Sequence, residues 1–137
     1  MRFEHTETAS TSASPDAVWA LWGDPDTWSG WDPAVEAVRL DGPFAAGATG
    51  VMVLAGGIEA PVALTVVEPG ARYVDRLTLG ELVIEIDHVV HDTGGGSTLT
   101  VSTTITGPGA DDIGPMVTRD APTALARLRE LAEAGPR

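Results

Sequence analysis

Four polar side chains interrupt apolar, strand-like segments in the second half of the sequence. Tyr73, Asp75 and His88 lie in the stretch YVDRLTLGELVIEIDHVV, and Thr103 lies in the next such segment. A two-residue turn at Gly80 and Glu81 predicts a hairpin that puts Tyr73 opposite His88. Imidazole titrates near neutral pH, and a buried carboxylate needs a partner. We therefore expect these side chains to gather on one face of a sheet as a candidate proton-transfer site.

The alternation of side chains along a strand defines the rest of this face. The hairpin register also pairs Leu79 with Leu82, Leu77 with Ile84, and Asp75 with Ile86. Neighbouring segments extend the face with aliphatic residues, namely Val51, Val53, Ala60, Val62, Leu64, Val66, Val90, Leu99 and Val101. Within this set we expect Val51 and Val53 opposite Ala60 and Val62, and Leu64 and Val66 beside Asp75 and Tyr73. We expect Leu99, Val101 and Thr103 beside Val90, His88 and Ile86.

Each polar residue also has a purely structural interpretation. His88 is either an acid, base or ligand contact in a cavity, or a core histidine bonded to Tyr73 or Asp75. Asp75 is costly on an apolar face unless it contacts His88, Arg76 or a ligand. Tyr73 either polarises a carbonyl with its hydroxyl or fills space. Thr is common in strands for its shape alone, so Thr103 is the weaker candidate.

Composition excludes several classes of function. The chain has 137 residues, a formal charge of -12, no Lys and no Cys. The acidic charge disfavours nucleic acid and anionic membranes, and the missing residues rule out lysine Schiff bases and thiolate chemistry. No three-ligand spacing around His5 or His91 matches a zinc site, so we expect no metal. Without a long apolar run, we expect one cytoplasmic domain over residues 1–137 and no membrane insertion.

The first third of the chain predicts one strand and two short helices. A Thr-rich segment over residues 3–11 reads as a strand. Ser14 as N-cap and Pro15 predict a helix from Pro15 to about Trp22, and Asp24 caps a second one that ends near Gly30. Residues 19–33 hold all four tryptophans. Of these, Trp22 should pack inward with Val18, and Trp31 should anchor the chain as it enters the second strand.

The remainder predicts a sheet followed by a long helix. Gly and Pro signals divide residues 34–107 into six strands joined mostly by hairpins. Val117, Ala121, Ala124, Leu125, Leu128 and Leu131 recur at helical spacing on one face. Pro115 suits the opening turn of this helix, Asp111 and Asp112 should cap it, and Pro122 threatens a kink. A seven-stranded antiparallel sheet with one apolar face needs this C-terminal helix as its cover.

The sequence resembles the START-like (SRPBCC) superfamily in three respects. These are this order of elements, the stretch SPDAVWALWGDPDTWSGWDPAV and the late hairpin HVVHDTGGGSTLTV. Within this superfamily, the sequence resembles the polyketide cyclase/dehydrase and lipid-transport group. The resemblance covers nearly the whole chain and implies an α+β helix-grip fold. In such a fold the sheet curls around the long C-terminal helix, two short helices follow the first strand, and an apolar cavity lies between sheet and helix.

The resemblance also implies a function without a cofactor. As a polyketide cyclase or dehydrase, the protein would cyclise or dehydrate a ketone-bearing substrate, with His88 moving the proton, Tyr73 bonding the enolate and Asp75 orienting His88. The expected ligand contacts are Trp28 at the cavity mouth with Val53, Val62, Leu64, Ile86, Val101, Thr103, Met116, Val117 and Asp120. The alternatives are a carrier or sensor of a lipid-like or polyketide-like ligand, and a protein-interaction module. Either a monomer or a homodimer is compatible.

Overall fold

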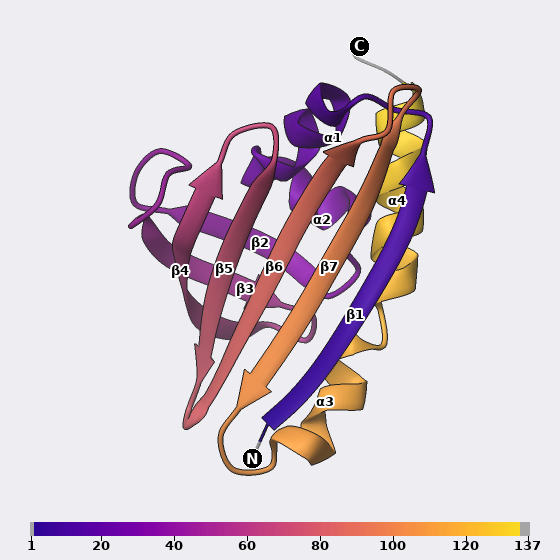
Figure 1. Ribbon diagram of the computed structural model, residues 1–137. Coiled ribbons are helices and arrows are strands. Elements are labelled where there is room, and N and C mark those ends of the chain that lie inside the picture. Colours follow the sequence, from indigo (N-terminus) through magenta and orange to yellow (C-terminus); the bar gives the residue numbers. More distant parts are fainter. Residues whose placement is uncertain (1, 135–137) are drawn as a thin grey trace.

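The computed structural model describes residues 2–134. Its strands are β1 (Arg2–Thr11), β2 (Val35–Leu40), β3 (Thr49–Leu54), β4 (Ile58–Glu68), β5 (Arg72–Leu79), β6 (Leu82–Asp92) and β7 (Ser97–Thr106). Its helices are α1 (Pro15–Trp22), the 3-10 turn η1 (Pro25–Thr27), α2 (Trp28–Trp31), α3 (Ala110–Thr118) and α4 (Ala121–Ala134) (Figure 1). None of these helices is long and apolar enough to cross a membrane.

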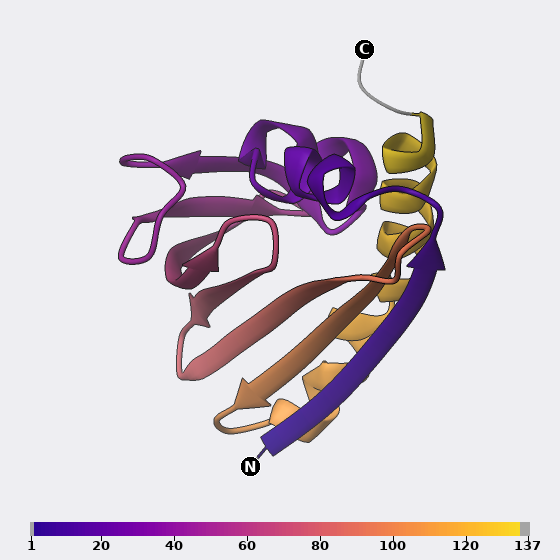
Figure 2. The ribbon, with the colours of Figure 1, turned by 45° about the horizontal axis from the view of Figure 1, so that its top comes forward.

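The strands form one antiparallel sheet with the order β1-β7-β6-β5-β4-β3-β2. The sheet curves from β1, which lies beside α4, round to β2, which lies beside α2 (Figure 2). α3 packs against β1 and β7, and α4 packs against β1, α1 and α2. The predicted α+β helix grip is therefore confirmed.

The capping residues fix the two short helical segments where the sequence predicts them. The Ser14 hydroxyl accepts a hydrogen bond of 3.2 Å from the Ala17 N–H, so α1 begins at Pro15. The Asp24 carboxylate accepts one of 3.2 Å from the Asp26 N–H at the start of η1. Because α2 continues directly from η1, the second helical segment ends at Trp31, one residue beyond the expected Gly30.

The strand register matches the prediction in the centre of the sheet. Tyr73 pairs with His88 and Asp75 with Ile86 between β5 and β6. His88 in turn pairs with Val101 between β6 and β7. Both hairpins have short Gly-containing connections, and Leu77, Ile84, Ile86 and Val101 lie on the concave face.

The register expected for β3 and β4 is wrong by one residue. The turn there holds three residues, 55–57, because the Gly57 N–H bonds the Leu54 carbonyl at 3.0 Å and Leu54 pairs with Ile58. Val53 therefore pairs with Glu59, and Met52 pairs with Ala60 and takes the inward position, only 3% exposed.

A second difference lies between β4 and β5. Leu64 pairs with Asp75 as expected, but a bulge follows it, and Val67 rather than Val66 lies opposite Tyr73. The additional residue is absorbed without changing which face of β5 points inward.

The C-terminal helix is broken into α3 and α4 at Arg119 and Asp120. Pro122 has no N–H for the carbonyl of Thr118, and its ring would clash with that carbonyl in a continuous helix, so α3 ends at Thr118. The hydroxyl of Thr118 also bonds back to the Gly114 carbonyl at 3.0 Å, which favours a bend. The kink predicted at Pro122 is thus confirmed.

Other details of the helix prediction are wrong. The helix begins at Ala110 rather than at Pro115, which lies inside α3. Asp111 and Asp112 lie in the first turn, where the helix dipole favours them, but neither caps it with a side-chain hydrogen bond. On α4, Ala132 is buried whereas Leu131 is 45% exposed.

The contact between α3 and β1 gives a test of the packing. A Cβ added at Gly114 would lie 2.2 Å from Cγ of the Phe3 ring. Gly114→Ala should therefore lower the free energy of unfolding by about 1 to 3 kcal/mol, measured by chemical denaturation. Gly30→Ala, in α2 with no atom within 4 Å of the added Cβ, is the matched control and should change it by less than about 1 kcal/mol. Equal effects would show that α3 does not pack on Phe3.

Candidate functional site

A cavity of about 340 Å³ lies between the concave face of the sheet, the segment that enters β2, and the helices α3 and α4. Its wall is mainly apolar, with side chains from the sheet such as Met52, Leu77 and Ile84 and from the helices such as Ile113 and Leu125. The residues that bend the C-terminal helix, Arg119 and Asp120, also line it.

Most of the candidate residues from the sequence lie at this cavity. They are Trp28, Tyr73, Asp75, Ile86, His88, Val101, Thr103, Met116, Val117 and Asp120. Three others lie elsewhere. Val62 and Leu64 are buried in the core but are not part of the cavity wall. Val53 is displaced from the wall by the three-residue turn described above, and Met52 lines the cavity in its place.

The Tyr73 ring is held by other aromatic rings. It stacks on the His88 imidazole with ring centres 3.9 Å apart and planes within 6°, and on Trp28 with centres 5.6 Å apart. The rings of Trp22 and Phe44 meet it edge-on at 5.8 and 5.4 Å. Burial, with smaller contributions from Asp75 and Asp32, raises the pKa of Tyr73 well above its usual value. The phenol therefore stays protonated and is available as a donor.

His88 is a neutral imidazole at physiological pH. Burial lowers its pKa to about 4, although the backbone carbonyl of Tyr73 acts in the opposite direction. Its Nδ1 lies 3.3 Å from that carbonyl, which as an acceptor fixes the proton on Nδ1 and leaves Nε2 unprotonated. Among the described residues, no hydrogen bond joins His88 to Asp75, so the expected orienting contact is absent.

Asp75 is a buried carboxyl with an unused oxygen. The residue is 3% exposed, and Oδ1 has no hydrogen-bond partner among the described residues. Burial raises the pKa of Asp75 to about 7, its own backbone N–H lowers it, and the charge of Asp32 raises it. Arg76 is not its partner, because that guanidinium lies 3.6 Å from Glu85 on the other face.

Asp32 is a site residue that the sequence analysis missed. It lies between α2 and β2, lines the cavity, and accepts a hydrogen bond of 2.9 Å from the Ala34 N–H. Burial raises the pKa of Asp32 and the charge of Asp120 raises it further, against that hydrogen bond. In the sequence, Asp32 stands between Trp31 and Pro33, and a charge next to these apolar neighbours is the one local signal that could have identified it.

Large apolar side chains lie exposed at the edge of the cavity. Ile58 at the start of β4 is 54% exposed and Met116 on α3 is 58% exposed, and both line the cavity. Trp28 and Trp31, in contrast, are 3% and 4% exposed. The tryptophan segment therefore forms part of the cavity wall rather than a free aromatic surface.

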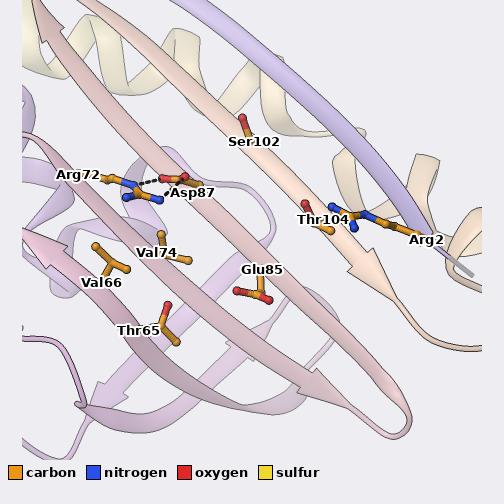
Figure 3. Close-up of a pocket in the computed structure, with 9 residues that line it drawn as sticks. All are labelled: Arg2, Thr65, Val66, Arg72, Val74, Glu85, Asp87, Ser102 and Thr104. Carbon is orange, nitrogen blue, oxygen red and sulfur yellow. Dashed lines mark hydrogen bonds and ion pairs between the residues drawn. The ribbon is translucent and has the colours of Figure 1, made fainter.

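A second hollow, of about 330 Å³, lies on the opposite face of the sheet (Figure 3). Its charged residues already have partners. Arg72 donates two hydrogen bonds of 2.9 Å to Asp87, Arg2 lies 3.0 Å from Glu4, and Glu85 pairs with Arg76. The concave cavity, with its unpartnered carboxyl, is the better candidate for a site.

The sequence model of one protein family matches residues 2–133, and that family is described as polyketide cyclase/dehydrase and lipid transport. The chain belongs to this family. No curated protein matches the chain.

Solved structures with low sequence identity share the fold. Protein MLL2253 from Mesorhizobium loti is 15% identical with a TM-score of 0.82, and the match covers 98% of this chain and 100% of that one. The di-domain ARO/CYC protein StfQ of the steffimycin biosynthetic pathway is 14% identical with a TM-score of 0.81, over 98% of this chain and 51% of that one. Norcoclaurine synthase from Thalictrum flavum, in complex with dopamine and hydroxybenzaldehyde, is 17% identical with a TM-score of 0.75, over 100% and 90%.

The raised pKa of Asp75 predicts how stability depends on pH. Between the usual carboxyl pKa and about 7, the folded protein keeps a proton that the unfolded chain has released, so stability falls as pH rises through this range. Asparagine does not titrate in this range, so Asp75→Asn removes this fall in stability with rising pH. At about pH 8 the variant should exceed the wild type in free energy of unfolding by on the order of 2 kcal/mol, and the gain should vanish near pH 4.

The measurement is urea denaturation across this pH range. Asp26→Asn, which removes an exposed carboxylate from the η1 turn, is the control and should follow the wild-type profile. A profile for Asp75→Asn parallel to that of the wild type would contradict the raised pKa.

Proposed function

We propose that the protein binds a hydrophobic or aromatic small molecule in the concave cavity and catalyses proton transfer on it, as a polyketide cyclase or dehydrase would. The observation that carries this proposal is Asp75, a buried carboxyl with a free oxygen on the wall of an apolar cavity. Membership of the polyketide cyclase/dehydrase and lipid-transport family supports the binding part.

The shape and lining of the cavity suit an aromatic or polycyclic ligand. A volume of about 340 Å³ falls in the usual range for small-molecule sites. Aliphatic side chains form most of the wall, and Trp28 and Trp31 contribute aromatic rings to it. The few polar groups, which include Asp75, His88 and Thr103, are available to orient the ligand.

The chemistry that fits these groups is enolisation of a ketone. The Asp75 carboxylate takes a proton from the carbon beside the carbonyl, and the Tyr73 hydroxyl donates a hydrogen bond to the carbonyl oxygen as negative charge develops there. In a cyclisation, the enolate carbon attacks a second carbonyl, and the new alkoxide recovers the proton from Asp75. In a dehydration, Asp75 returns the proton to a β-hydroxyl, which leaves as water.

This assignment exchanges the roles that the sequence suggested for His88 and Asp75. A base works best when its pKa lies near the working pH, and the pKa of about 7 for Asp75 meets this condition better than the pKa of about 4 for His88. His88 then acts as a positioning residue, because its stacking holds the Tyr73 ring.

The alternative function is a carrier or sensor that uses the same cavity without chemistry. The exposed Ile58 and Met116 at its edge offer an apolar path for a ligand to enter and leave. A protein-interaction role for the tryptophan segment is less favoured, since Trp22, Trp28 and Trp31 are buried.

An exchange assay separates the enzyme from the carrier. The protein should bind 2-acetylnaphthalene, seen as quenching of tryptophan fluorescence, and should catalyse deuterium exchange of its methyl protons in D₂O, followed by NMR. The exchange rate should rise as pH rises through about 7, since Asp75 accepts a proton only as the carboxylate. Asp75→Asn and Tyr73→Phe should each lower the rate by about 100-fold.

Two controls show whether a lower exchange rate is due to the loss of the Asp75 or Tyr73 group itself. Asp26→Asn should keep the wild-type rate, and circular dichroism should show that each variant is folded. Saturable binding without exchange would support the carrier or sensor, and exchange that persists in Asp75→Asn would overturn the proposed mechanism.

A further inference from the structure

We infer that the ligand of the cavity carries a protonated amine, which the carboxylates of Asp32 and Asp75 bind while its apolar part lies against the wall. This inference rests on the binding part of the proposed function and not on the catalytic step. The inference specifies the charge of the ligand, and membership of the family does not.

The charged groups of the cavity wall are mostly acidic. Asp32, Asp75 and Asp120 line it, and Arg119 is the basic residue beside them. The Arg119 side chain is 72% exposed, and its Nε lies 3.8 Å from Asp120. In the part of the chain that the structure describes, neither Asp32 nor Asp75 has a basic partner, so the wall has an excess of negative charge.

Oδ1 of Asp75 can accept a hydrogen bond that a donor on a ligand would supply. An unpaired oxygen on a buried carboxyl costs free energy that a donor from a ligand would recover. An ammonium group supplies both a hydrogen bond and a positive charge, whereas a hydroxyl supplies the hydrogen bond alone. An anionic ligand, such as a free fatty acid, would meet repulsion from the same carboxylates.

The three carboxyls interact with one another through space. The charge of Asp32 raises the pKa of Asp75, and the charge of Asp120 raises that of Asp32. A cation among them reverses this effect and favours the ionised form of Asp75. The bound amine would therefore lower the pKa of Asp75 and keep its carboxyl ionised.

The surrounding rings favour an organic cation over a metal ion. Trp28 and Trp31 line the cavity, and the faces of such rings attract ammonium groups. Within residues 2–134, no group of three His, Asp or Glu side chains is arranged to hold a metal ion. An amine with an aromatic or aliphatic body satisfies both the acidic and the apolar parts of the wall.

Three naphthalene probes of matched size test this inference. They are 2-naphthylmethylamine, which is cationic, 2-naphthylmethanol, which is neutral, and 2-naphthoate, which is anionic. Calorimetry at about pH 8 should give an amine affinity about tenfold or more above that of the alcohol, the effect expected of a charge-assisted hydrogen bond. The naphthoate should bind most weakly, and the preference for the amine should shrink as pH falls below about 7, where Asp75 is protonated.

Variants identify the carboxylates responsible. Asp75→Asn and Asp32→Asn should each lower the ratio of amine to alcohol affinity by about tenfold. Glu59→Gln, which removes an exposed carboxylate outside the cavity, should leave this ratio unchanged. Using two variants keeps the test valid if one of them fails to fold, as circular dichroism would show.

The outcomes separate this inference from the proposed function. Equal affinity for amine and alcohol, tighter binding of the naphthoate, or a ratio that neither cavity variant changes would overturn the amine inference alone. If none of the probes binds, the proposed ligand-binding function fails with it.

Discussion

The register of the β5–β6 hairpin decides which chemistry faces the cavity. With Tyr73 opposite His88 and Asp75 opposite Ile86, all three polar side chains point to the concave face. A slip by one residue would turn them outward and bring Arg72 and Val74 inside. The rings of Tyr73 and His88 stack 3.9 Å apart across the two strands. This contact stabilises the β5–β6 register together with the aliphatic cross-strand pairs.

The tryptophan segment completes the site from outside the sheet. Trp28 stacks on Tyr73, and its indole N–H donates to the Trp22 carbonyl at 3.1 Å, which joins α2 to α1. Directly after α2 the chain delivers Asp32 to the cavity. The same aromatic contacts that exclude water from Tyr73 therefore also place a second carboxylate near Asp75, and that charge helps to keep Asp75 protonated near neutral pH.

Sequence patterns predicted the fold well because short turns and alternation are local signals. Gly80 and Glu81 were enough to define the central hairpin, and Pro122 was enough to mark the bend in the C-terminal helix. The β3–β4 register escaped prediction because a turn of two residues and one of three both fit Ala55, Gly56 and Gly57. Asp32 was missed because its role depends on burial against residues far away in sequence, which no local pattern reports. The base role that we propose for Asp75 in place of His88 likewise depends on burial, which raises the pKa of Asp75 to about 7 and lowers that of His88 to about 4.

The proposed function depends most directly on the pKa of Asp75, which burial at an apolar cavity and the charge of Asp32 raise to near neutral pH. Carbon-detected NMR of the side-chain carboxyl follows this titration directly in protein labelled with ¹³C-aspartate, with Asp75→Asn assigning the resonance. We expect a midpoint at about 7. A midpoint at the ordinary aspartate value of about 4 would contradict it, because the carboxyl would then be solvated or paired in a way that the structure does not contain.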